Sequence, residues 1–182
     1  MKKVACILWV SVCALLVLSA AGRATKIIYQ SPKELATQSS QIVRGIVTSV
    51  KSYWNEEGTK IFTEALVAVD ETYKGASIRE ARVLQLGGIV GHVNMHVEGA
   101  LTWRPDEEVL LFLEPNVPGT FSVSGFSQGK FDIVRDPRTG RVFVGGVDLG
   151  GVELVGGSPG AAPAPPGKVS LDQFINETLG RR

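Results

Sequence analysis

The sequence predicts a mainly β fold, a small barrel or sandwich, and three observations support this prediction. Runs of apolar and β-branched residues with the length of strands recur from residue 41 to residue 144. Short stretches rich in glycine, proline, asparagine and aspartate separate these runs, as turns do between strands. Two segments carry helix-start signals, one before the first strand and one near the C-terminal end. Many strands with few helices are typical of small all-β domains.

Residues 1–24 are predicted to be a secretory signal peptide. A basic N-terminus precedes an apolar run over 4–18, and small residues follow the run. The run is shorter than the ~20 residues that a membrane span needs, so we expect cleavage and no stable span afterwards. Cleavage is expected after Ala24, with Gly22 as the alternative. The sequence therefore predicts an exported protein, periplasmic or extracellular.

Composition narrows the chemistry that the exported chain can use. Cys6 and Cys13 both lie in the leader, so the remaining chain has no thiol for a disulfide, a nucleophile or a metal. Loss of Lys2, Lys3 and Arg23 leaves 16 of the 19 basic residues against 18 acidic ones, a net charge of −2. The chain has no basic stripe, and we therefore expect no nucleic-acid partner.

A short helix is expected over residues 32–39. Ser31 can cap it, Pro32 suits the first helical position, and Glu34 stands where a capping box needs an acid. The helix has little apolar face of its own, which predicts that it packs on something larger.

Strands are expected next, beginning at residue 41. The run 41–50 is β-branched, and Gly45 inside it indicates a bulge or a sharp bend. Residues 54–59 have the composition of a hairpin loop. Further strands are predicted over 61–73 and 82–86.

The same kinds of sequence pattern predict the strands of the second half of the barrel. Residues 108–113 are continuously apolar, which predicts a strand buried on both faces. Shorter strands are expected over 120–124, 130–134 and 141–144, the last two joined by a Pro/Gly turn.

Two segments interrupt this rhythm. Residues 87–99 form a long, glycine-rich and apolar stretch, and residues 156–168 form a flexible Gly/Pro/Ala linker. A final helix is expected after Ser170, which can cap it. The expected helix is amphipathic, with its apolar side formed by Leu171, Phe174, Ile175 and Leu179. The predicted organisation is a leader 1–24, a barrel domain 25–155, a linker 156–168 and a C-terminal helix 169–182.

The order of these pieces resembles a known family. A short helix leads into Gln-Ile-Val-Arg-Gly-Ile-Val at 41–47, a long strand ends in Val-Asp-Glu-Thr-Tyr-Lys-Gly at 69–75, and Asp-Glu-Glu-Val-Leu-Leu-Phe-Leu stands at 106–113. Over about 31–134, this layout resembles the N-terminal domain of the tissue inhibitors of metalloproteinases and related netrin-type modules. It is also similar to secreted bacterial proteins of unassigned function. The resemblance implies a five-stranded OB-type barrel, closed or partly open.

The chemistry of those inhibitors does not carry over to this chain. In the family an N-terminal cysteine chelates the zinc of the target protease, and the exported chain has no cysteine. A shared fold does not by itself imply a shared function.

The two histidines are the residues to consider for a metal. His92 and His96 have the i, i+4 spacing of a helical metal site, with Glu98 and Met95 as further ligands. The glycines and β-branched residues around them disfavour a helix, and on a strand the two residues would stand ~13 Å apart. We therefore predict no bound metal and no other cofactor, and His92, His96 and Glu98 stay as the candidates for one.

Aromatic residues suggest a binding surface instead. Trp54 is expected near a hairpin tip and Trp103 follows the glycine-rich stretch, where they either anchor a ligand or cover the ends of the barrel. An exposed patch around Trp103 and Val90, extended by His92, Met95 and His96, is the predicted binding face.

No catalytic motif supports an enzyme. The serines around Gly125 lack the nucleophile-elbow pattern, and no triad spacing occurs. The leading hypothesis is an exported, non-enzymatic binding module for an envelope or extracellular protein or glycan. Two alternatives stay open: a metal-binding protein that uses His92 and His96, and a structural envelope component that docks through its C-terminal helix.

Overall fold

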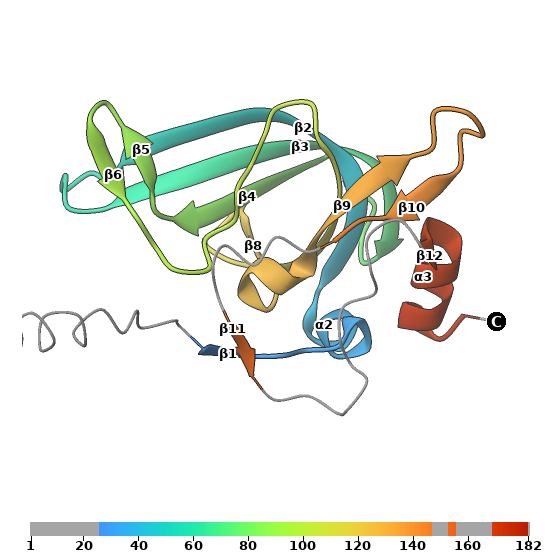
Figure 1. The fold of residues 1–182 in the computed structure, drawn as a ribbon. Coiled ribbons are helices and arrows are strands. Elements are labelled where there is room, and N and C mark those ends of the chain that lie inside the picture. Colours follow the sequence, from blue (N-terminus) through green and yellow to red (C-terminus); the bar gives the residue numbers. More distant parts are fainter. Residues whose placement is uncertain (1–25, 147–152, 156–168, 182) are drawn as a thin grey trace, which may run out of the picture.

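The computed structural model describes residues 26–146, 153–155 and 169–181. The predicted leader 1–24 and the predicted linker 156–168 lie outside the described residues. The fold is mainly β, with one short helix before the barrel strands and one after them, as predicted (Figure 1). Within the described part, no helix is both long and apolar enough to cross a bilayer.

Five strands close into a mixed, OB-like barrel. They are β2 (Gln41–Trp54), β3 (Ile61–Lys74), β4 (Glu80–Leu86), β7 (Glu108–Pro115) and β8 (Phe121–Val123). The ring runs β2–β3–β4–β8–β7 and returns to β2. Every pairing in it is antiparallel except the one between β4 and β8.

On the β7 side the sheet continues beyond the ring. β9 (Lys130–Arg135), β10 (Val142–Val144) and β12 (Val169–Ser170) extend it in that order. The last strand leads directly into α3 (Leu171–Leu179), whose first turn is capped by Ser170. Because β12 pairs with β10, the C-terminal helix is held beside the barrel.

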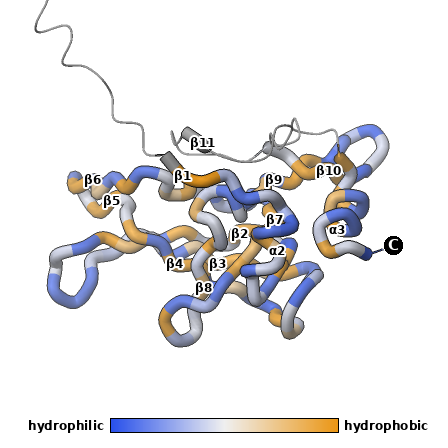
Figure 2. The backbone as a smooth tube through the Cα atoms, turned by 90° about the horizontal axis from the view of Figure 1, so that it is seen from below, coloured by the Kyte–Doolittle hydropathy of each residue, from blue (hydrophilic) through white to orange (hydrophobic). Residues whose placement is uncertain are grey.

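Smaller elements lie elsewhere on the molecule. The stretch predicted as a glycine-rich loop contains a hairpin of β5 (Gly88–Val90) and β6 (Val93–Met95). β1 (Lys26–Ile28) pairs in parallel with β11 (Glu153–Val155). Figure 2 shows the β5–β6 hairpin at one end of the molecule, α3 at the other, and β1 beside β11. A 3₁₀ turn, η1 (Phe126–Gly129), joins β8 to β9.

β7 separates two hydrophobic clusters. Val109, Leu111 and Leu113 face the cluster inside the barrel, whereas Leu110 and Phe112 face a second cluster outside it. This confirms the prediction of a strand buried on both faces. The second cluster is completed by both helices, through Leu35, Ala36, Leu171 and Ile175.

Two local predictions are confirmed. α2 (Pro32–Gln38) begins with a capping box, in which the Ser31 N–H donates to Glu34 Oε2 at 2.6 Å and the Glu34 N–H donates to Ser31 Oγ at 3.3 Å. The register of β2 on β3 shifts between Arg44 and Gly45. A Cβ at Gly45 would collide with the Ala68 carbonyl, so only glycine allows this close approach of the strands.

Candidate functional site

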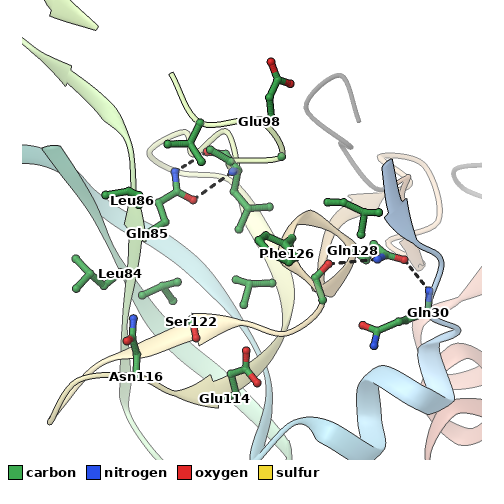
Figure 3. Close-up of a pocket in the computed structure, with 18 of the residues that line it drawn as sticks. Gln30, Leu84, Gln85, Leu86, Glu98, Glu114, Asn116, Ser122, Phe126 and Gln128 are labelled. Atoms are coloured by element: carbon green, nitrogen blue, oxygen red, sulfur yellow. Dashed lines mark hydrogen bonds between the residues drawn. The ribbon is translucent and has the colours of Figure 1, made fainter. Parts of the chain in front are cut away.

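A groove of about 990 Å³ opens along the seam between β4 and β8, and we call it the seam groove (Figure 3). Its walls come from β4, the segment 97–101, the β7–β8 hairpin, η1 and residues 27–30. Apolar side chains dominate the lining; among them are Ile27, Ile28, Phe62, Leu84, Leu86, Val97, Leu101 and Phe126. The polar side chains are Gln30, Gln38, Gln85, Glu98, Glu114, Asn116, Ser122 and Gln128.

The seam groove exists because β4 and β8 diverge. The two parallel strands share one register pair, Val83 with Phe121. On its other edge, β4 pairs with β3 along its whole length, from Glu80 to Leu86. Beyond the single bridge the barrel wall opens, and the space is walled by segments that belong to no strand of the ring.

On one wall, Gln85 fastens a loop to the barrel. Its side-chain Nε2 donates to the Leu101 carbonyl at 2.9 Å, and its Oε1 accepts from the Leu101 N–H at 3.2 Å. The same oxygen accepts from the Trp103 indole N–H at 3.2 Å. The amide thus replaces the backbone pairing that a further strand would supply.

On the opposite wall, Gln128 does the same for the N-terminal segment. Its Oε1 accepts from the Gln30 N–H at 2.8 Å, and its Nε2 donates to the Ile28 carbonyl at 3.1 Å. In Figure 3 Gln128 and Gln30 lie across the groove from Leu84 and Leu86. Both walls are therefore positioned by a buried or half-buried glutamine amide rather than by a ladder of backbone bonds.

The rim carries exposed apolar side chains. Ile28 is 73% exposed, Phe126 65% and Leu86 37%. Phe126 also has a φ of +59°, directly after Gly125 with a φ of +66°. A left-handed conformation is costly for an aromatic residue, so the surrounding structure imposes it, and such outliers gather at functional sites.

The charges in the groove are negative. Glu98 and Glu114 line it, and no lysine, arginine or histidine stands among its described lining residues. Glu98 Oε1 lies 3.2 Å from His96 Nε2 at the exposed surface. Figure 3 shows Glu98 toward one end of the groove and Glu114 toward the other.

Trp103 does not lie on an exposed face, which corrects the predicted patch around Trp103 and Val90. Its side chain is only 9% exposed and belongs to the cluster inside the barrel. Lys130 Nζ lies 5.4 Å from its ring centroid and also contacts Glu107 and Asp132. Trp103 therefore covers an end of the barrel, the alternative role considered for it.

The other predicted binding residues gather at the β5–β6 end of the molecule. Trp54 ends β2 and is 39% exposed, with Tyr53, Ile89 and Val93 also exposed. Val90 pairs with Val93, and Met95 Sδ accepts from the Ile61 N–H at 3.2 Å. These residues form a separate apolar surface, and of the predicted set Glu98 alone lines the seam groove.

The two histidines are not part of a cluster of metal-ligating side chains in the part of the chain that the structure describes. His92 lies in the turn between β5 and β6, and His96 follows β6 beside Glu98. Among the described residues, no group of three or more His, Cys, Asp or Glu side chains could hold a metal ion. The structure brings His96 and Glu98 together and leaves this pair without a third ligand.

Shifted pKa values occur at structural contacts. The backbone and side chain of Ser31 hold the pKa of Glu34 below its usual value, and the backbone N–H groups of Arg138 and Thr139 do so for Asp136. Burial, aided by Glu71, raises the pKa of Tyr73. Burial also raises the pKa of Tyr29, which lies within the segment 28–30 that Gln128 holds.

Sequence reasoning missed the residues that build the seam groove. Gln85, Gln128 and Phe126 stand in segments predicted as strand or turn, and nothing local marks the roles of the two glutamines. The glycine before Phe126 was the available signal, because Gly125 introduces the left-handed turn.

No family model and no curated protein sequence matches this chain.

Proposed function

We propose that this protein is an exported, non-enzymatic binding module whose ligand lies in the seam groove. The observation that carries the proposal is an apolar groove with Phe126 held at its rim in a strained, exposed conformation. Concave apolar sites with a few polar groups are the usual binding sites of proteins. The predicted leader supports export, and the groove of an exported protein would face the periplasm or the exterior.

We further propose that the barrel is of the netrin type. The capped helix before the first strand, the bulge at Gly45 and the β7 motif at 108–113 support this assignment. The zinc-chelating cysteine of the inhibitors has no counterpart, so the proposed role is binding without protease inhibition.

We propose the groove in preference to the C-terminal helix as the docking surface. Its apolar side is buried, because Leu171 and Ile175 belong to the outer cluster with Phe112 and Phe131. Phe174 packs at centroid distances of 5.1 Å from Phe131 and 6.5 Å from Phe112. Because the apolar side of this helix completes the outer cluster, it is not free to bind a partner. The seam groove is therefore the better candidate for the binding site.

Retention of ligand from the cell envelope tests the proposed site. The wild type, Phe126→Ala and the matched surface control Val134→Ala would be immobilised and exposed to envelope extract. We expect the wild type and Val134→Ala to retain the same protein or glycan, and Phe126→Ala to lose most of it. Equal retention by all three proteins would contradict the proposal that the ligand binds in the seam groove.

A fourth variant separates the two apolar surfaces. Trp54→Ala changes the β5–β6 end of the molecule and leaves the seam groove intact. We expect it to retain ligand as the wild type does. Loss of ligand in Trp54→Ala, with retention in Phe126→Ala, would place the binding site at the β5–β6 end instead.

Amino-terminal sequencing of the exported protein tests the leader. We expect the mature chain to begin at Thr25, or at Arg23 for the alternative site. A product that begins at Met1 would contradict export by cleavage.

A further inference from the structure

The edge of β4 that faces the seam groove carries free backbone groups. The Gly87 N–H donates to the Ile61 carbonyl at 2.8 Å, in register with the β3–β4 ladder. Odd-numbered residues of β4 therefore direct their N–H and C=O groups to β3, and even-numbered ones direct theirs to the opposite edge. Leu84 and Leu86 thus present backbone groups toward the groove.

Most of these groups have no strand partner. On this edge the single parallel bridge between Val83 and Phe121 uses the Leu84 N–H, and the Leu84 carbonyl and both backbone groups of Leu86 lie beyond it. Among the described residues, no further strand pairs with β4 beyond the bridge, and no loop bond reaches the N–H or C=O of Leu86. An edge of this kind is a template for an added strand.

The two glutamines that hold the groove walls are not available to a ligand. Gln85 uses both ends of its amide on Leu101, and Gln128 uses both ends of its amide on residues 28 and 30. These two amides are therefore already occupied. The free backbone groups of β4 offer hydrogen bonds that the main chain of an extended polypeptide can make.

The charges and apolar side chains of the groove indicate which ligand side chains it would bind. Glu98 and Glu114 supply negative charge without a cation in the described lining, and Leu86 and Phe126 offer apolar contact. A strand places alternate side chains on opposite faces. A segment that alternates apolar and basic residues could contact the apolar rim with one face and the carboxylates with the other.

We propose that the ligand of the seam groove is an extended polypeptide segment of alternating apolar and basic residues, which adds to the free edge of β4 as a strand. This inference rests on the proposed function and specifies its ligand. Main-chain bonds to Leu86 give affinity, and the carboxylates select for lysine or arginine.

Three short synthetic peptides test the ligand on the exported protein. The first alternates valine and lysine, the second alternates valine and glutamate, and the third is the first with every amide N-methylated. The third keeps the side chains and charge but donates no backbone hydrogen bond. Affinity is measured by titration calorimetry, and amide hydrogen exchange is followed at Leu86.

We expect the valine–lysine peptide to bind and to slow exchange of the Leu86 amide. The N-methylated copy should bind at least about tenfold more weakly, because it cannot donate backbone hydrogen bonds to the β4 edge. The valine–glutamate peptide should also bind more weakly, and the difference should shrink in high salt. Equal binding of the N-methylated copy would overturn strand addition.

Variants of the protein test the same contacts from the other side. Leu86→Pro removes an N–H that β3 does not use, and Leu86→Ala is the matched control that keeps it. We expect the proline variant to bind the valine–lysine peptide about threefold to tenfold more weakly than the alanine variant. Glu98→Gln and Glu114→Gln should each weaken binding about twofold to fivefold, whereas Glu56→Gln, in the distant β2–β3 loop, should not.

Other outcomes separate this inference from the proposed function. Envelope ligand retained through Phe126 but identified as a glycan, with no peptide binding, would overturn the inference and leave the binding module standing. A dimer that excludes the peptide would identify a second copy at the β4 edge and would also overturn it. No ligand of either kind in the groove would remove both proposals.

Discussion

The two sides of the barrel hold their strands together by different means. On one side, β2 pairs with β3 from Ile42 to Trp54 and with β7 from Gln41 to Ile46. On the other side, β4 and β8 share one bridge, and the amides of Gln85 and Gln128 hold the neighbouring segments. From Ile42 to Ile46 the two ladders occupy both edges of β2, whereas β4 beyond Val83 has, within the described residues, a strand partner on one edge only. Under the proposed function, the first side stabilises the fold and the second binds the ligand.

The largest expected effect lies on the laddered side. Phe112 is fully buried in β7, with ring centroids of Phe131 at 5.4 Å and of Phe174 at 6.5 Å. Phe112→Ala should lower the free energy of unfolding by about 3–5 kcal/mol, because it leaves a cavity beside the two remaining rings. Urea denaturation followed by circular dichroism measures this. Val134→Ala is the surface control, expected within about 0.5 kcal/mol of the wild type. A loss below about 1 kcal/mol for Phe112→Ala would contradict the assignment of the outer cluster as core.

A smaller effect is expected where an amide replaces a ladder. Gln85→Leu keeps the size of the side chain but leaves the Leu101 backbone and the Trp103 indole without their partner. We expect a loss of about 2–3 kcal/mol, because each unsatisfied buried group costs about 1–3 kcal/mol and the loop can partly rehydrate. Trp103 fluorescence should shift to the red as the loop opens, and amide exchange at Leu101 should accelerate.

Gln128→Leu provides the matched comparison on the opposite wall. It should release residues 28–30 and leave the emission of Trp103 unchanged. The same fluorescence shift in both variants would show that the two walls are not independent.

An effect of opposite sign is expected at the rim. Phe126→Gly should raise the stability of the protein by about 0.5–1 kcal/mol, since glycine adopts a φ of +59° without the strain of an aromatic residue. Phe126→Ala keeps the strained conformation and should leave stability near that of the wild type. Both variants should lose ligand. Thermal unfolding and ligand retention are measured on the same variants. Together they test whether the strained Phe126 lowers the stability of the protein while it contributes to ligand binding. A glycine variant less stable than the wild type would show that the ring is a structural contact.

The smallest expected effect is the pH dependence of the capping box on α2. The bonds from Ser31 lower the pKa of Glu34 in the folded state. A lowered pKa means that this contribution is complete above the pKa of the unfolded chain and is lost as the pH falls through the folded pKa. The melting temperature of the wild type should exceed that of Glu34→Ala at pH 7, and the difference should shrink under acid conditions. A difference that stays constant down to strongly acidic pH would contradict the charged capping box.

Elements with local signals could be predicted from the amino-acid sequence. Ser31 and Glu34 predicted the start of α2, the apolar run at 108–113 predicted a doubly buried strand, and Gly45 predicted the bulge. Each of these depends on a few neighbouring residues, because capping, alternation and close backbone approach act over a turn or a strand pair.

The separation of β4 from β8, and the segments that wall the groove between them, depend on contacts between distant parts of the chain. Gln128 meets Gln30 across 98 positions of the chain, and Gln85 meets Trp103 across 18. Trp103 looks exposed beside a glycine-rich stretch, yet barrel closure buries it. Contacts of this kind are set by how a closed sheet brings distant segments together, and no local pattern of residues encodes that geometry.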